Sequence, residues 1–169
     1  MTMTTERIVR AGLLLAAAAL IAACQAQSPE EMAPTESTSS APNMTVYHDP
    51  DCGCCSKWID HMRVNGFAVE AVPTRDMNRM KRDLGVPRNL PSCHTAVVGD
   101  YVIEGHVPAG DVKRLLAEQP DARGLSVPGM PLGSPGMEMG DRRMAYDVIQ
   151  FHEDGDTSVF THYEAIERE

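Results

Sequence analysis

Residues 45–55 read Thr45-Val46-Tyr47-His48-Asp49-Pro50-Asp51-Cys52-Gly53-Cys54-Cys55. The first four residues, 45–48, carry the β-branched and aromatic side chains that favour a short strand. Pro50 between two aspartates indicates a turn, with Asp51 placed to cap a helix that begins among the cysteines. The stretch therefore predicts a strand that leads directly into cysteines at a helix N-terminus.

The helix that follows has one apolar face. Its apolar residues recur at the spacing i, i+3, i+4 and i+7, and they are Cys55, Trp58, Ile59 and Met62. Asn65-Gly66 then provides a typical helix end. This pattern predicts that the helix packs on a sheet and holds the cysteines at its buried start.

The rest of the chain alternates short strands and helices. The patterns predict a strand at 67–72, a polar helix at 76–84, a hairpin of strands 95–98 and 101–104, and a helix at 111–118 with Val112, Leu115 and Leu116 inward. Residues 126–144 are rich in Gly, Pro and Met and predict a long loop, and residues 146–151 and 157–160 predict a final hairpin. This order predicts a thioredoxin-like α/β fold, a mixed central sheet with flanking helices plus a C-terminal β-hairpin.

Composition narrows the class of protein. A chain of 169 residues fits one globular domain with some extra length. A net charge of -9 and an aromatic content of 5% argue against nucleic acid as a partner. The 11 Met, 5 Cys and 6 His residues are a high density of thioether, thiol and imidazole groups, which are ligands for soft metal ions.

The N-terminal residues are typical of an export signal. Arg7 and Arg10 precede the apolar run 11–23, which is too short to span a bilayer. The run ends Leu20-Ile21-Ala22-Ala23-Cys24, which resembles a bacterial lipobox and would make Cys24 the lipidated first residue. The alternatives are an ordinary secretory signal or an uncleaved anchor. We interpret residues 1–23 as a lipoprotein signal peptide that directs the chain to the periplasmic side of the cell envelope.

Residues 24–43 are rich in Ser, Thr, Pro, Ala and Glu and predict a flexible tether. Residues 44–169 would then form the folded, metal-binding domain.

Four cysteines remain within this domain: Cys52, Cys54, Cys55 and Cys93. A helix N-terminus stabilises thiolates, and a disulfide between the adjacent Cys54 and Cys55 would be strained, so the cluster is expected to be reactive rather than a structural staple. In a thioredoxin-like fold the loop before residues 95–98 lies against the first helix. Cys93 would then complete a set of four thiolates, with His94 at its edge.

Four interpretations of this cluster stay open. Cys52 and Cys55 form a C-x-x-C pair, as in thiol-disulfide oxidoreductases, although Cys54 could trap such a disulfide in the wrong pairing. Two plain disulfides or a zinc site are further alternatives. Thiolates together with thioethers favour Cu(I), whereas zinc would need no methionines. Copper is therefore the preferred interpretation.

Other candidate ligands surround this set. Met137 and Met139 have a spacing that suits Cu(I) capture, and Met130 lies nearby in the same loop, although methionines also fill gaps over apolar surfaces. His48 and His106 are candidates for contacts with the ligands. The remaining histidines are expected at the surface, and they are His61, His152 and His162.

Four motifs in register resemble the CopG-type copper-resistance family, an exported thioredoxin-like family long catalogued as a domain of unknown function. They are Tyr47 to Cys55, Ser92-Cys93-His94-Thr95-Ala96-Val97, Tyr101 to Pro108, and the two Pro-Gly-Met segments within 127–138. The resemblance implies a Cys-bridged multinuclear copper site on Cys52, Cys54, Cys55 and Cys93. No proline immediately precedes Thr95, and the nearest is Pro91, which departs from the thioredoxin pattern and argues against disulfide exchange.

The sequence thus predicts an envelope protein that holds copper, as a multinuclear Cu(I) thiolate cluster, for copper tolerance by sequestration, transfer or copper redox. Its expected partners are copper ions, other envelope copper-handling proteins and, through the lipid, the membrane. Whether it is an enzyme stays open, and a thiol-disulfide oxidoreductase that uses Cys52 and Cys55 is the alternative.

Overall fold

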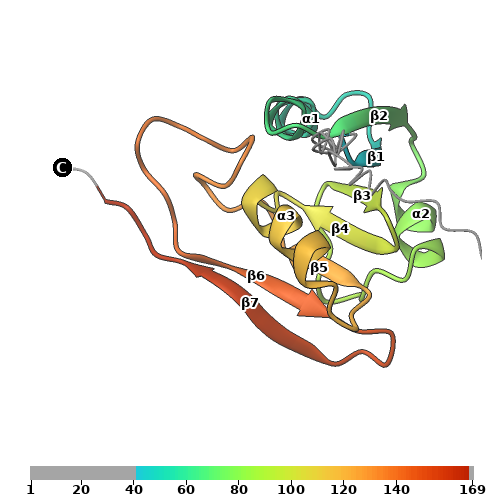
Figure 1. Ribbon diagram of the computed structural model, residues 1–169. Helices are drawn as coiled ribbons and strands as arrows, with labels where there is room; N and C mark the ends of the chain where they lie inside the picture. The colour runs from blue at the N-terminus through green and yellow to red at the C-terminus, as the bar shows by residue number, and fades with distance from the viewer. Residues whose placement is uncertain (1–40, 168–169) are drawn as a thin grey trace, which may run out of the picture. The chain divides into compact units, whose positions relative to one another are not determined.

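Seven strands and three helices make up residues 41–167, the part of the chain that the computed structural model describes (Figure 1). The strands form one mixed sheet in the order β2-β1-β3-β4-β5-β6-β7. The elements are β1 (Asn43–His48), α1 (Gly53–Val64), β2 (Ala68–Pro73), α2 (Met77–Asp83), β3 (His94–Val98), β4 (Tyr101–Gly105), α3 (Ala109–Glu118), β5 (Gly124–Val127), β6 (Tyr146–Phe151) and β7 (Thr157–Tyr163). The predicted mixed α/β fold is confirmed.

Strand β1 lies inside the sheet and delivers the chain to the cysteines. It pairs in parallel with β2 and antiparallel with β3, so that His48, its last residue, lies opposite His94, the first residue of β3. Met44, Val46 and His48 are buried, and the residues between them are less so. This alternation is that of a strand with one face on the core.

The turn between β1 and α1 differs from the prediction. Cys52, not Asp51, is the N-cap residue of α1, and no side chain caps the helix. Asp49 organises the turn instead, because its carbonyl accepts a hydrogen bond from Cys52 N at 3.0 Å and its side chain accepts one from Asp51 N at 2.9 Å. The Asp51 carboxylate points outward and pairs with Arg75.

Helices cover both faces of the sheet. Buried residues of α1 and α3 pack in one core cluster with residues of β1, β3 and β4, including Trp58, Val112 and Ile103. As predicted, Cys55, Trp58, Ile59 and Met62 form the buried face of α1. Leu116 of α3 is only partly buried, whereas Leu115 is fully buried. A second cluster holds Val86, Leu90, Val102 and Phe151, with Leu84 from the end of α2 packed against it.

Strand β5 was not predicted. Its residues, Gly124–Val127, are all buried, and β5 pairs in parallel with β4 and antiparallel with β6. A Cβ atom at Gly124 would lie 1.8 Å from the carbonyl oxygen of Val102, so the close approach of β4 requires glycine here. Because β5 links β4 to β6, the C-terminal hairpin β6–β7 extends the sheet.

None of the helices within residues 41–167 is long and apolar enough to cross a membrane.

Candidate metal centre

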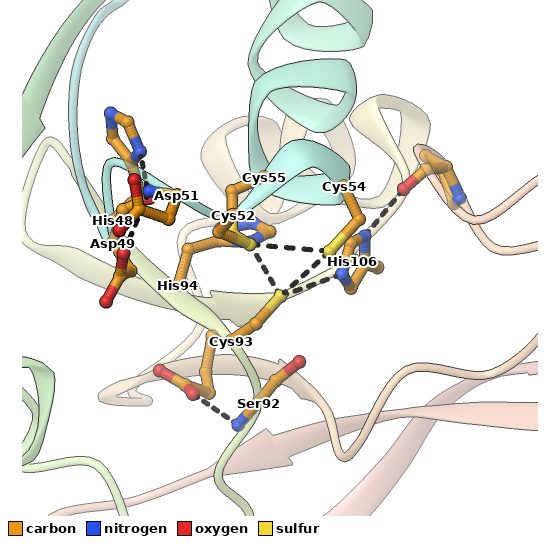
Figure 2. Close-up of a disulfide and its surroundings, with 12 residues drawn as sticks. His48, Asp49, Asp51, Cys52, Cys54, Cys55, Ser92, Cys93, His94 and His106 are labelled. Carbon is orange, nitrogen blue, oxygen red and sulfur yellow. Dashed lines mark hydrogen bonds between the residues drawn. A yellow bond between two sulfur atoms is a disulfide. The ribbon is translucent and has the colours of Figure 1, made fainter.

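The four cysteines of the folded domain meet where α1 begins. Cys52 occupies the N-cap position of α1, Cys54 and Cys55 lie in its first turn, and Cys93 directly precedes β3. The four Sγ atoms lie within 4.8 Å of one another. Cys54 Sγ lies 3.4 Å from Cys52 Sγ and 3.8 Å from Cys93 Sγ (Figure 2). The topology thus brings together cysteines separated by up to 41 positions in the sequence.

Two of these cysteines form a disulfide. Cys52 and Cys55 are bonded to each other, and Cys54 and Cys93 are free. This is the C-x-x-C pairing. One of the interpretations left open by the sequence was that the four cysteines form two disulfides, and the structure has only one among them. All four sulfurs would become available only after two electrons reduce the Cys52–Cys55 bond to two thiolates, which two protons convert to thiols.

Cys93 also belongs to a second group of donor atoms. Cys93 Sγ lies 3.0 Å from His106 Nε2 and 3.4 Å from His94 Nδ1 (Figure 2). His106 Nδ1 lies 2.8 Å from the carbonyl oxygen of Pro135, which can only accept a hydrogen bond. Nδ1 therefore carries a proton, and in the neutral ring Nε2 presents its lone pair towards Cys93.

The His94 ring is fully buried among aromatic side chains. Its ring packs against Trp58, with ring centroids 4.4 Å apart, and edge-on against His106, with centroids 4.9 Å apart. Nε2 of His94 is buried without a hydrogen-bond partner, although buried polar atoms are usually paired. One nitrogen of this ring thus faces Cys93 while the other is unsatisfied.

Burial also sets the protonation of these donor groups. It raises the pKa of Cys93 to about 12, with a further contribution from the neighbouring Cys54. Burial lowers the pKa of His94 well below its usual value. Burial also lowers the pKa of His106, and the hydrogen bond to the Pro135 carbonyl offsets part of this shift. At neutral pH Cys93 is therefore a thiol and both imidazoles are neutral. A metal ion that binds Cys93 must displace its proton.

The donor set fits a soft metal ion. Its donor atoms are four sulfurs and two imidazole nitrogens, and neither group contains a carboxylate. Thiolates favour Cu(I), and imidazole also suits Cu(II) and zinc. A soft metal ion could be held by Cys52, Cys54, Cys55 and Cys93, or by Cys93 with His94 and His106.

The connection between β5 and β6 brings two methionines beside Cys54. A hollow of about 310 Å³ is lined by Gly53, Cys54, Lys57, Gly136, Met137, Glu138 and Met139. Gly136 permits this contact, because its φ is +84° and a Cβ atom there would lie 2.8 Å from the carbonyl oxygen of Cys54. Met139 is largely exposed at the rim, and Met130 is exposed and does not line the hollow.

The other histidines take varied positions. His48 is buried at the end of β1, lies outside both donor groups, and has Nδ1 3.0 Å from its neighbour's carbonyl oxygen. The prediction that His61 lies at the surface is wrong, since His61 is half-buried and its Nε2 accepts a hydrogen bond from Ala109 N. His152 is also half-buried, beside Gln150, whereas His162 is exposed beside Asp147.

Sequence reasoning missed a buried ion pair behind Cys93. Lys81 Nζ lies 2.6 Å from Glu104 Oε1, and the Glu104 side chain is fully buried. The signal was present in the predicted hairpin, because its register places Glu104 opposite Thr95 on the strand that follows Cys93.

Together, the fold and the site define an α/β protein with a sulfur-rich centre, flanked by imidazoles, that could hold a soft metal ion. The family described as "Protein of unknown function, DUF411" matches residues 90–137. The chain is 46% identical to a solved structure named "Copper resistance protein copG- Form 2" and 47% identical to the "Form 1" structure. Each match has a TM-score of 0.70 and covers 73% of this chain and 98% of the other. No curated protein matches.

The chain therefore belongs to the CopG copper-resistance family, and the resemblance seen in its motifs is confirmed.

Proposed function

We propose that the chain binds several copper ions through Cys52, Cys54, Cys55 and Cys93 and contributes to copper tolerance in the cell envelope. The proposal rests on Cys93, because its sulfur belongs to both groups of donor atoms. One group is the four cysteines, and the other is Cys93 with His94 and His106. One thiolate sulfur can bridge two metal ions, so a sulfur shared by two donor groups suits a multinuclear centre better than a single ion.

The two donor groups suit different oxidation states of copper. After reduction of the disulfide, the four thiolates would hold Cu(I), and Met137 and Met139 line the approach to Cys54. The imidazoles of His94 and His106 also suit Cu(II). An arrangement with soft donors on one side and nitrogen donors on the other supports copper redox as well as sequestration and transfer.

Metal content tests the proposal. Protein purified after export from copper-fed cells is expected to carry more than one copper per chain, since two or three thiolates satisfy one Cu(I) and four can bridge several. The measurement is elemental analysis, combined with a thiol count before and after metal removal. A single zinc per chain without copper would contradict the proposal.

A thiol-disulfide oxidoreductase is the second candidate function. The Cys52–Cys55 bond favours it, because this is the C-x-x-C pair that such an enzyme would use. The free Cys54 thiol lies 3.4 Å from Cys52 and could attack the bond, which would trap a catalytic disulfide in the wrong pairing. The copper function is therefore preferred.

We also place the domain in the thioredoxin-like class. The parallel β1-α1-β2 unit, the antiparallel β3–β4 hairpin and the following α3 support this placement.

Attachment to the periplasmic side of the membrane through Cys24 is a further part of the proposal, and the signal peptide, Cys24 and most of the tether lie outside the described residues. Cys24→Ala is expected to move the protein from the membrane fraction to the soluble fraction, because one lipidated residue supplies the membrane affinity. Copper content per chain should not change. Immunoblots of fractionated cells provide the measurement. Unsubstituted mature protein that is already soluble and carries no lipid by mass would contradict lipidation.

A further inference from the structure

Glu104 makes an unusual set of contacts on the side of β3 and β4 that faces α2. Its carboxylate oxygen Oε1 accepts hydrogen bonds from Ser92 N at 2.5 Å and from Lys81 Nζ at 2.6 Å. The other oxygen, Oε2, accepts one from Thr95 Oγ1 at 2.7 Å. Lys81 Nζ also donates to Thr95 Oγ1 at 3.0 Å, so the four residues form a closed network.

The network binds the chain on both sides of Cys93 and His94, two donors of the candidate metal centre. Ser92 and Thr95 are the residues on either side of Cys93 and His94. A single buried carboxylate on β4 therefore holds both ends of the short segment that carries the Cys93 sulfur and the His94 ring (Figure 2 shows Ser92 beside Cys93).

A second contact fixes the same segment. Ser92 Oγ donates a hydrogen bond to the carbonyl oxygen of Gly129, just after β5. Ser92 also packs so closely on Gly105 that a Cβ atom there would lie 2.4 Å from Ser92 Cβ. The backbone before Cys93 is thus held from β4 and from the chain after β5.

We propose that Glu104, held in place by Lys81, is a positioning residue that fixes Cys93 and His94 for metal binding. A buried ion pair is a weak source of stability, because apolar residues of similar volume often replace one without loss. Its carboxylate is, however, the acceptor that the Ser92 N–H and the Thr95 hydroxyl share. The effect on copper rests on the proposed function, whereas the effect on the position of Cys93 does not.

The test compares Glu104→Gln, Lys81→Met and the double variant with a matched control. Asp111→Asn is that control, because Asp111 is another buried carboxylate, on α3, which accepts hydrogen bonds from Thr161 Oγ1 and Tyr163 OH at 2.5 and 2.7 Å. Thr95→Val removes only one of the three bonds to Glu104 and serves as the milder variant if Glu104→Gln does not fold.

The first readout needs no copper. In metal-free protein with the Cys52–Cys55 bond intact, the alkylation rates of Cys93 and Cys54 by iodoacetamide are followed by mass spectrometry. Glu104→Gln is expected to raise the ratio of the Cys93 rate to the Cys54 rate about fivefold, since a charged hydrogen bond to the segment is lost. Thr95→Val should raise it about twofold, and Asp111→Asn should leave it unchanged.

The double variant separates positioning from charge pairing. It is expected to regain the thermal stability lost in Lys81→Met, because no unpaired charge remains buried, while its alkylation ratio stays raised. A double variant with the ratio of the unsubstituted protein would overturn the proposal, as would equal ratios in Glu104→Gln and Asp111→Asn.

Copper per chain is the second readout. It is expected to fall about threefold in Glu104→Gln and to stay unchanged in Asp111→Asn, because the supporting partners of metal ligands affect metal binding. Full copper content in Glu104→Gln would overturn the proposal. An unsubstituted protein without copper would overturn the proposed function alone, because the alkylation ratio would still report the role of Glu104.

Discussion

Replacing Cys93 by serine is expected to remove nearly all copper from the protein. Cys93 supplies a sulfur to the four-cysteine group and lies 3.0 Å from His106 Nε2, so its loss breaks both donor groups at once. A serine hydroxyl has a similar size but is a hard donor that suits Cu(I) poorly. We expect copper per chain to fall at least about tenfold, because ligands of one cluster act as a unit.

Cys54→Ser and Ser56→Ala complete this comparison. Cys54 belongs only to the four-cysteine group, so its replacement should also lower copper strongly, and both cysteine variants should lower copper tolerance. Ser56 is exposed on α1 one residue after Cys55, and its replacement by alanine should leave copper unchanged. Elemental analysis and circular dichroism of the purified proteins provide the measurements. Full copper content in a folded Cys93→Ser protein would contradict a shared cluster.

The same variants distinguish copper binding from disulfide catalysis. A C-x-x-C enzyme that uses Cys52 and Cys55 does not need Cys54, so Cys54→Ser would leave its activity intact or raise it. We expect the unsubstituted protein to be near background in a disulfide-exchange assay. Efficient turnover by that protein, with Cys54→Ser fully active and still loaded with copper, would favour the oxidoreductase.

Much of the fold could be predicted because its periodic patterns are strong. The apolar face of α1 and the strands that flank Gly99-Asp100 follow from side-chain spacing alone. Strand β5 could not be found in this way. Its four residues include only two apolar side chains, Leu125 and Val127, which pack in the main core cluster, and the buried Ser126 hydroxyl donates to the Leu90 carbonyl oxygen. An alternation over only four residues, next to a Gly- and Pro-rich segment, is too short to predict a strand.

The candidate site, like the fold, could be predicted from the sequence only in part. The proximity of Cys93 to the start of α1 could be predicted from the order of the elements. The second donor group could not, since it depends on Gly105, whose φ of +71° ends β4 just before His106, and on Pro135, which fixes the His106 ring. The predicted hairpin could place Glu104 opposite Thr95, but not its pairing with Lys81, because charged residues in short elements are usually exposed.

The oxidation state of Cys52 and Cys55 is expected to decide how much copper the protein can hold. The disulfide occupies two of the four sulfurs, and Cys54 and Cys93 remain free. Reduction by a phosphine supplies two electrons, and two protons come from water, so both sulfurs become thiols. Anaerobic titration with Cu(I) against a chromophoric chelator should therefore show at least about twofold higher capacity in the reduced protein than in the oxidised protein.

The double variant Cys52→Ser, Cys55→Ser is the matched control for this titration. It keeps Cys54, Cys93 and both imidazoles but has no bond to reduce, so phosphine treatment should leave its Cu(I) capacity unchanged and close to that of the oxidised protein. Equal capacities of the oxidised and reduced forms of the unsubstituted protein would contradict a four-thiolate site. They would mean instead that Cys54, Cys93 and the imidazoles hold the copper and that the disulfide is structural, because a sulfur kept in a disulfide cannot act as a thiolate ligand.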